Sequence, residues 1–72
     1  MIEKYKKEIF NRASKENMPI KESLSKILWA EYYCASPPLF KLLNNIKFPI
    51  GTIISDVKRL DILAEQIIEA NE

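Results

Sequence analysis

Hydrophobic residues recur along this chain three or four positions apart, which is the spacing that places side chains on one face of an α-helix. The clearest example lies between residues 19 and 35, where the apolar positions are Ile20, Leu24, Ile27, Leu28 and Ala35. Pro19 suits the first turn of such a helix, because proline lacks the N–H group that would have no partner there. We therefore predict a central helix from Pro19 to Ala35.

The residues on either side predict three further helices. Residues 2–16 are amphipathic, with one face formed by Ile2, Tyr5, Ile9 and Ala13. Residues 39–45 predict a short third helix, and Ser36, followed by two prolines, suits its capped first turn. Residues 52–70 predict the fourth helix, with Thr52 or Ser55 as its cap. Its apolar seam has spacings of four and three and consists of Ile53, Val57, Leu60, Ala64 and Ile67.

No segment alternates apolar and polar residues with a period of two over the length of a strand. The only strand-like window, residues 48–54, contains Pro49 and Gly51, which both disfavour a strand. The sequence therefore predicts an all-α fold. We expect a small compact helical bundle of three long helices plus one short helix, forming a single domain over residues 1–72.

The size of the chain limits how this bundle can be stabilised. A domain of 72 residues buries only roughly 60% of the surface that its unfolded chain exposes, so its hydrophobic core is thin. Cys34 is the only cysteine, which excludes a disulfide within one chain, and we expect it to be buried as a small apolar side chain. The sequence has no histidine, so no metal site is expected. Regular helix packing or association, including a homodimer, is left as the source of stability.

The overall composition is that of an ordinary folded protein, with 47% hydrophobic residues and a formal net charge of +1. Glu3 and Glu8 interrupt the N-terminal lysines and no apolar segment follows them, so we expect no signal peptide. No apolar run approaches the about 20 residues that a membrane-spanning helix requires. Together with the single Cys34, these features predict a cytoplasmic protein.

An enzyme is not expected. Without histidine, the chain lacks the usual general base near neutral pH, and Cys34 would lack the imidazole partner of a cysteine nucleophile. A single glycine cannot build a phosphate-binding loop. We therefore expect neither a cofactor nor a small-molecule substrate.

The central helix carries a second, aromatic side. Trp29 and Tyr33 are four residues apart and lie roughly opposite the apolar stripe, with Tyr32 beside them. A second layer of the same molecule would bury these rings, whereas a contact surface would present them to a partner, since Trp and Tyr are enriched at interfaces. We expect the partner-binding residues to be Trp29, Tyr33, Tyr32 and Ile62, the last on the polar side of the fourth helix.

Glu31 interrupts the apolar stripe of the central helix. Either the stripe opens to solvent there, or the carboxylate pairs with a cation on a neighbouring helix. A buried carboxylate without a partner would instead have a raised pKa and would mark a functional site. Arg12 is the best candidate partner, because it lies at the edge of the apolar face of the first helix.

Residues 39–63 look loosely like a helix-turn-helix motif, in which Lys58 and Arg59 would contact nucleic acid. The connection from Leu43 to Thr52 is longer than the turn of that motif, and residues 52–72 carry two basic and five acidic side chains, which would repel phosphates. Nucleic acid is therefore not the expected partner. The sequence favours a non-enzymatic protein–protein interaction module (an adaptor, inhibitor or regulatory subunit, with a homodimer as one form). The alternative is a small helix-turn-helix-like nucleic-acid-binding regulator.

Overall fold

The computed structural model describes residues 2–46 and 55–71. Within these ranges the chain forms four helices and no strands: α1 (Ile2–Ser14), α2 (Ile20–Tyr33), α3 (Pro37–Asn45) and α4 (Asp56–Ala70). The all-α prediction is thus confirmed, with three long helices and one short helix. No helix in this described part of the chain is long and apolar enough to cross a membrane.

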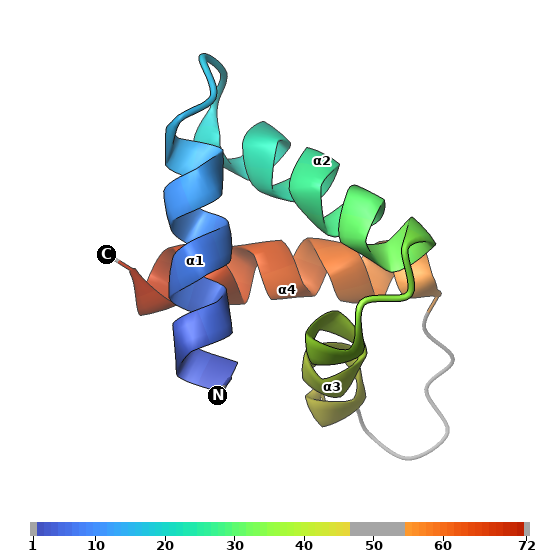
Figure 1. The fold of residues 1–72 in the computed structure, drawn as a ribbon. Coiled ribbons are helices and arrows are strands. Elements are labelled where there is room, and N and C mark those ends of the chain that lie inside the picture. The colour runs from blue at the N-terminus through green and yellow to red at the C-terminus, as the bar shows by residue number, and fades with distance from the viewer. Residues whose placement is uncertain (1, 47–54, 72) are drawn as a thin grey trace.

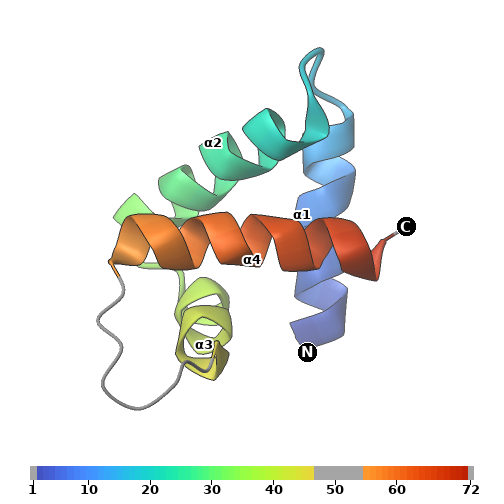
Figure 2. The same ribbon diagram turned by 180° about the vertical axis from the view of Figure 1, so that it is seen from behind.

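Helices α2 and α4 form the longest pairing and run antiparallel. At the start of α2, Lys21 Nζ lies 2.6 Å from Glu65 Oε1 and 3.3 Å from Asp61 Oδ1. At the end of α2, the hydroxyl of Tyr32 donates a hydrogen bond to the carboxylate of Asp56 at the start of α4. Helix α1 stands across α4, and α3 lies below the junction of α2 and α4 (Figures 1 and 2).

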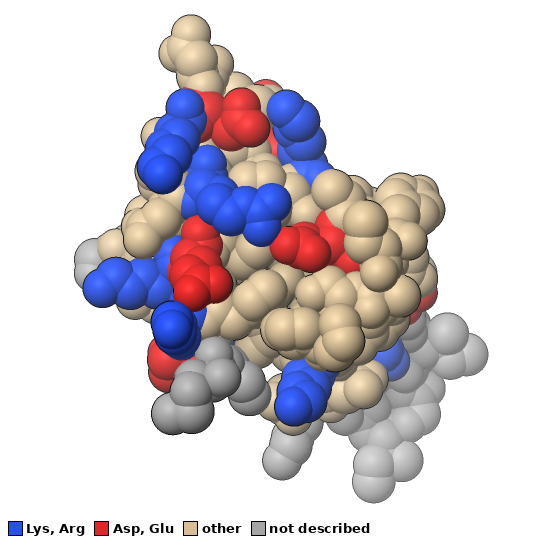
Figure 3. Space-filling view, in the orientation of Figure 1, with Lys and Arg blue, Asp and Glu red and all other residues tan. Residues whose placement is uncertain are grey.

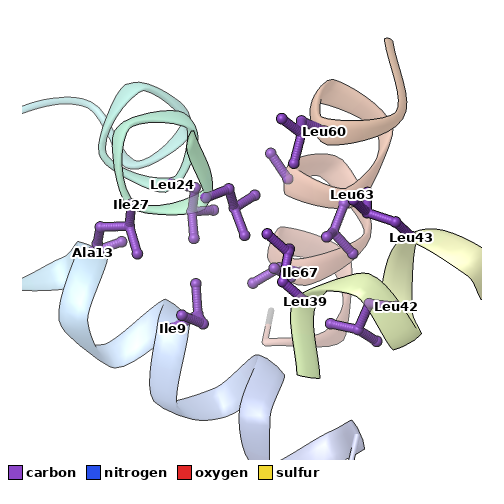
Figure 4. Close-up of a cluster of buried hydrophobic side chains, with 12 residues drawn as sticks. Ile9, Ala13, Leu24, Ile27, Leu39, Leu42, Leu43, Leu60, Leu63 and Ile67 are labelled. Carbon is purple, nitrogen blue, oxygen red and sulfur yellow. The ribbon is translucent and has the colours of Figure 1, made fainter. Parts of the chain in front are cut away.

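The core lies where the four helices meet. Figure 4 shows side chains from every helix pointing into one cluster. The buried apolar residues are Ile9, Ala13, Leu24, Ile27, Leu28, Leu39, Leu42, Leu43, Leu60, Leu63, Ala64 and Ile67. These side chains include most of the stripe that the sequence predicts for the central helix, because its three- and four-residue spacing turns them all toward α1, α3 and α4.

Two residues of the predicted stripes lie outside the core. Val57 is 62% exposed, although it lies in the first turn of α4 and belongs to the predicted seam. The buried face of α4 is formed instead by Leu60, Leu63, Ala64 and Ile67. Ala35 is exposed because α2 ends at Tyr33, two residues before it. Thr52 and Ile53 lie outside the residues that the structure describes.

The caps explain where two of the helices begin. Ser55 is the N-cap of α4, and its hydroxyl accepts a hydrogen bond from the backbone N–H of Lys58 at 3.3 Å. This contact satisfies one of the N–H groups that the first helical turn leaves without a partner. Pro19 is the N-cap of α2, one residue before the helix, and its carbonyl accepts the N–H of Ser23 at 3.0 Å.

Candidate contact surface

Four aromatic side chains gather where α2 ends and α3 begins. Trp29, Tyr32 and Tyr33 occupy the last turns of α2, and their ring centroids lie 5.4 to 5.9 Å apart. Phe40 of α3 joins them, with its ring 5.5 Å from that of Tyr32. Rings at these separations attract one another by edge-to-face or offset contacts beyond their burial alone. We call these four residues the aromatic cluster.

The members of the aromatic cluster differ in exposure. Trp29, Tyr32 and Phe40 are half-buried and pack against the core, whereas Tyr33 is 79% exposed. The sequence placed Trp29 opposite the apolar stripe and hence away from the core. In the structure, part of its side chain nevertheless packs against the core. An indole is wide enough for one edge to reach the core while another stays in solvent. Tyr33 has no such inward contact and presents its ring to solvent.

Tyr32 links the aromatic cluster to α4. Its hydroxyl donates to the carboxylate of Asp56, which raises the pKa of Tyr32 above its usual value; burial and the charge of Asp56 act in the same direction. The bond joins residues 24 positions apart in the chain. It fixes the end of α2 against the start of α4, where the exposed Val57 comes next in the sequence.

Ile62, the fourth predicted contact residue, lies apart from the aromatic cluster. It follows Asp56 by six residues, which turns it about 240° around α4 from the side that meets Tyr32. Its side chain is half-buried. The sequence predicted Ile62 on the polar side of the fourth helix as an exposed contact residue, whereas its half-burial leaves only part of it accessible. The pattern gave no sign of Phe40 as a cluster member, because the approach of α3 to α2 depends on the turn between them.

Arg12 and Glu31 form an ion pair, which is one of the alternatives that the sequence left open for Glu31. Arg12 Nη1 donates to Glu31 Oε1 at 2.9 Å, joining α1 to α2. The Glu31 side chain is 22% exposed and that of Arg12 is 55% exposed, so the pair is partly screened by water. Tyr5 lies nearby: burial raises the pKa of its hydroxyl, the charge of Glu31 adds to this rise, and the Ser36 hydroxyl and Arg12 oppose it.

Three further residues that the sequence predictions named, Cys34, Lys58 and Arg59, differ from one another in how exposed they are. Cys34 is exposed, not buried, because it is the C-cap of α2 and lies beyond the helical stripe. On α4, Lys58 is exposed, but Arg59 is half-buried and its Nε is buried without a hydrogen-bond partner among the described residues. Helix α3 ends at Asn45 and α4 begins at Asp56, so the connection before Lys58 is indeed too long for a helix-turn-helix.

One further apolar surface lies at the opposite end of α2. An open groove of about 450 Å³ is lined by Phe10, Ala13, Ser14, Met18, Ile20 and Ile68. Met18 is 37% exposed there. Because α2 separates this groove from Tyr33, the two surfaces can be altered independently.

Comparisons with family models, with curated proteins and with solved structures each find no match for this chain.

Proposed function

We propose that this chain is a non-enzymatic protein–protein interaction module that associates with a second copy of itself through the aromatic cluster. The observation that carries the proposal is Tyr33, which is 79% exposed although its ring centroid lies 5.7 Å from that of Trp29. Trp and Tyr are the residues that most often carry binding energy at interfaces, because they are large, rigid and amphipathic. The lack of histidine supports a binding function over a catalytic one.

The charge of the surface supports a second copy as the occupant. In a two-fold symmetric dimer the same patch meets itself, so any uncompensated charge in the patch would face a like charge. None of the four cluster side chains carries a formal charge at neutral pH, and the adjacent Asp56 already accepts the Tyr32 hydroxyl. A domain of 72 residues also gains stability by burying further apolar surface in a dimer.

The test compares Tyr33→Ser with Met18→Ser. Both changes replace an exposed apolar side chain by serine, but Met18 lies at the other end of α2. Sedimentation of the purified chain from about 1 to 100 µM should show a monomer–dimer equilibrium. Tyr33→Ser should weaken the dimer at least tenfold, about 1.4 kcal/mol, while Met18→Ser leaves it unchanged.

Cys34 supplies a second readout, because it is exposed and follows Tyr33 directly. Its reaction with a maleimide should slow as the protein concentration rises, and Tyr33→Ser should abolish this protection. A chain that stays monomeric over the whole range would refute self-association. Equal weakening by Tyr33→Ser and Met18→Ser would place the contact elsewhere.

A further inference from the structure

Helices α2 and α3 are joined by only three residues, Cys34, Ala35 and Ser36. In the views of Figures 1 and 2, α3 leaves this turn at a steep angle to α2. A three- to four-residue turn between two helices that cross steeply is the geometry of a helix-turn-helix. The structure therefore places a tight turn of this type before α3, whereas the sequence pattern suggested one after it.

The backbone of the turn is well defined. The N–H of Ser36 donates to the carbonyl of Glu31, and the N–H of Ala35 donates to that of Tyr32, each at 3.1 Å. These two bonds form the Schellman motif, whose first residue after the cap takes the left-handed conformation. Ala35 does so with φ of 53°. A turn closed by two hydrogen bonds fixes the direction in which α3 projects.

Helix α3 has a buried inner face and an exposed outer face, with the half-buried Phe40 between them on one side. Leu39, Leu42 and Leu43 are buried in the core. The outer face is exposed and consists of Pro37, Pro38, Lys41, Asn44 and Asn45. Pro37, Lys41 and Asn44 follow one another at spacings of four and three, which aligns them along one side of the helix. The exposed side chains of this face are thus amides, one ammonium group and two proline rings.

The charge around α3 also suits a polyanion. Helix α3 contains no acidic residue, and on the face shown in Figure 3 its surface is blue and tan, while red atoms lie mainly over α1 and α2. The N-terminal end of α1 projects on the same side of the molecule as α3 (Figures 1 and 2). Its first two turns carry three lysines and two glutamates, a net charge of +1: Lys4, Lys6 and Lys7 against Glu3 and Glu8.

We infer that the outer face of α3 binds in the major groove of double-stranded DNA. The major groove admits an α-helix, and the second helix of a helix-turn-helix is the one that enters it. Asn44 and Asn45 would read base edges, since asparagine bonds adenine at two points. Lys41 would contact phosphate or guanine. Four of the five acidic residues that argued against DNA in the sequence belong to α4, not to α3. Asp56, the one that meets the end of α2, accepts the hydroxyl of Tyr32.

The experiment selects ligands for the full chain from a pool of double-stranded oligonucleotides with a random core. The enriched duplex should then bind about a thousandfold more tightly than an unselected duplex at physiological salt, as measured by fluorescence anisotropy. Lys41→Glu should weaken binding to both duplexes. The double change Asn44→Ala with Asn45→Ala should lower the preference for the enriched duplex at least tenfold.

Lys58→Glu is the matched control, because Lys58 is also exposed and its change alters the net charge by the same amount. It should leave the affinity for the enriched duplex within about threefold, because Lys58 belongs to α4 and not to the outer face of α3. Absence of enrichment, or binding lost completely by about 200 mM salt, would overturn the inference by showing only non-specific phosphate contact. Equal losses for Lys41→Glu and Lys58→Glu, or tighter binding to single-stranded RNA, would also overturn it.

Discussion

Ala35 offers a direct test of the turn between α2 and α3. Its φ of 53° is the only positive value found at a non-glycine residue in the described part of the chain. For an alanine, the left-handed conformation costs roughly 1–2 kcal/mol, because its Cβ crowds the following carbonyl oxygen. Glycine has no Cβ, but it loses about 0.5–1 kcal/mol more backbone entropy on folding. We therefore expect Ala35→Gly to stabilise the protein by about 0.5–1 kcal/mol.

Ala30→Gly is the matched control. Ala30 is exposed like Ala35 but lies within α2, where its carbonyl accepts the N–H of Cys34 at 3.1 Å. The same chemical change there should destabilise the protein by about 1 kcal/mol, because glycine in a helix interior has no strain to relieve. The two variants are thus predicted to shift stability in opposite directions.

Urea unfolding followed by the fluorescence of Trp29, the only tryptophan, measures both changes. All samples must have the same protein concentration, because association would add to the apparent stability. For a domain of this size, the change at Ala35 should raise the melting temperature by about 2–8 °C. A loss of stability in Ala35→Gly equal to that in Ala30→Gly would show that Ala35 is not left-handed in solution, and the proposed turn geometry would fail with it.

Two further predictions concern contacts between helices. A double-mutant cycle with Arg12→Ala and Glu31→Ala should give a coupling of about 0.5–1 kcal/mol, because the pair is partly exposed, and additive losses would mean that no pair forms. The contact with Asp56 raises the pKa of Tyr32 in the folded protein above the ordinary tyrosine pKa of 10.0. The stability that this contact contributes is therefore fully present below pH 10.0 and is lost as the pH rises through the pKa of Tyr32 in the folded protein. Absorbance titration should show a lower tyrosine pKa in Asp56→Asn, and identical titrations in the two proteins would contradict the contact.

Much of the fold follows from local pattern alone. The buried positions of α2 were predictable because a three- and four-residue spacing has only one inward face on a helix. The pairing of Arg12 with Glu31 could also be anticipated, since Glu31 interrupts the apolar stripe of α2 and Arg12 lies at the edge of the apolar face of α1. In both cases, the position of each residue relative to the apolar face of its own helix follows from the one or two helical turns around it.

The errors arise where a helix ends or where two helices meet. Cys34 and Ala35 were assigned to the central helix, but α2 stops at Tyr33 and leaves both exposed. Periodicity carries no signal for that end, because the Schellman turn places an alanine where glycine is usual. The neighbours Phe40 and Asp56 were missed for a different reason, since their contacts with Tyr32 depend on how three helices pack.

The two proposed surfaces meet at the same turn, and this makes their relation testable. The aromatic cluster lies on one side of α3, reached through Phe40, and the outer face with Lys41 and Asn44 lies beside it. If two chains associated through their aromatic clusters, the two-fold axis of the dimer would pass close to both copies of α3. A DNA site bound by such a dimer would then contain two half-sites in inverted orientation. If selection with the unchanged chain yields inverted repeats, and selection with Tyr33→Ser yields only single half-sites, then dimer formation contributes to sequence-specific DNA binding. Single half-sites in both proteins would show that the surfaces act separately.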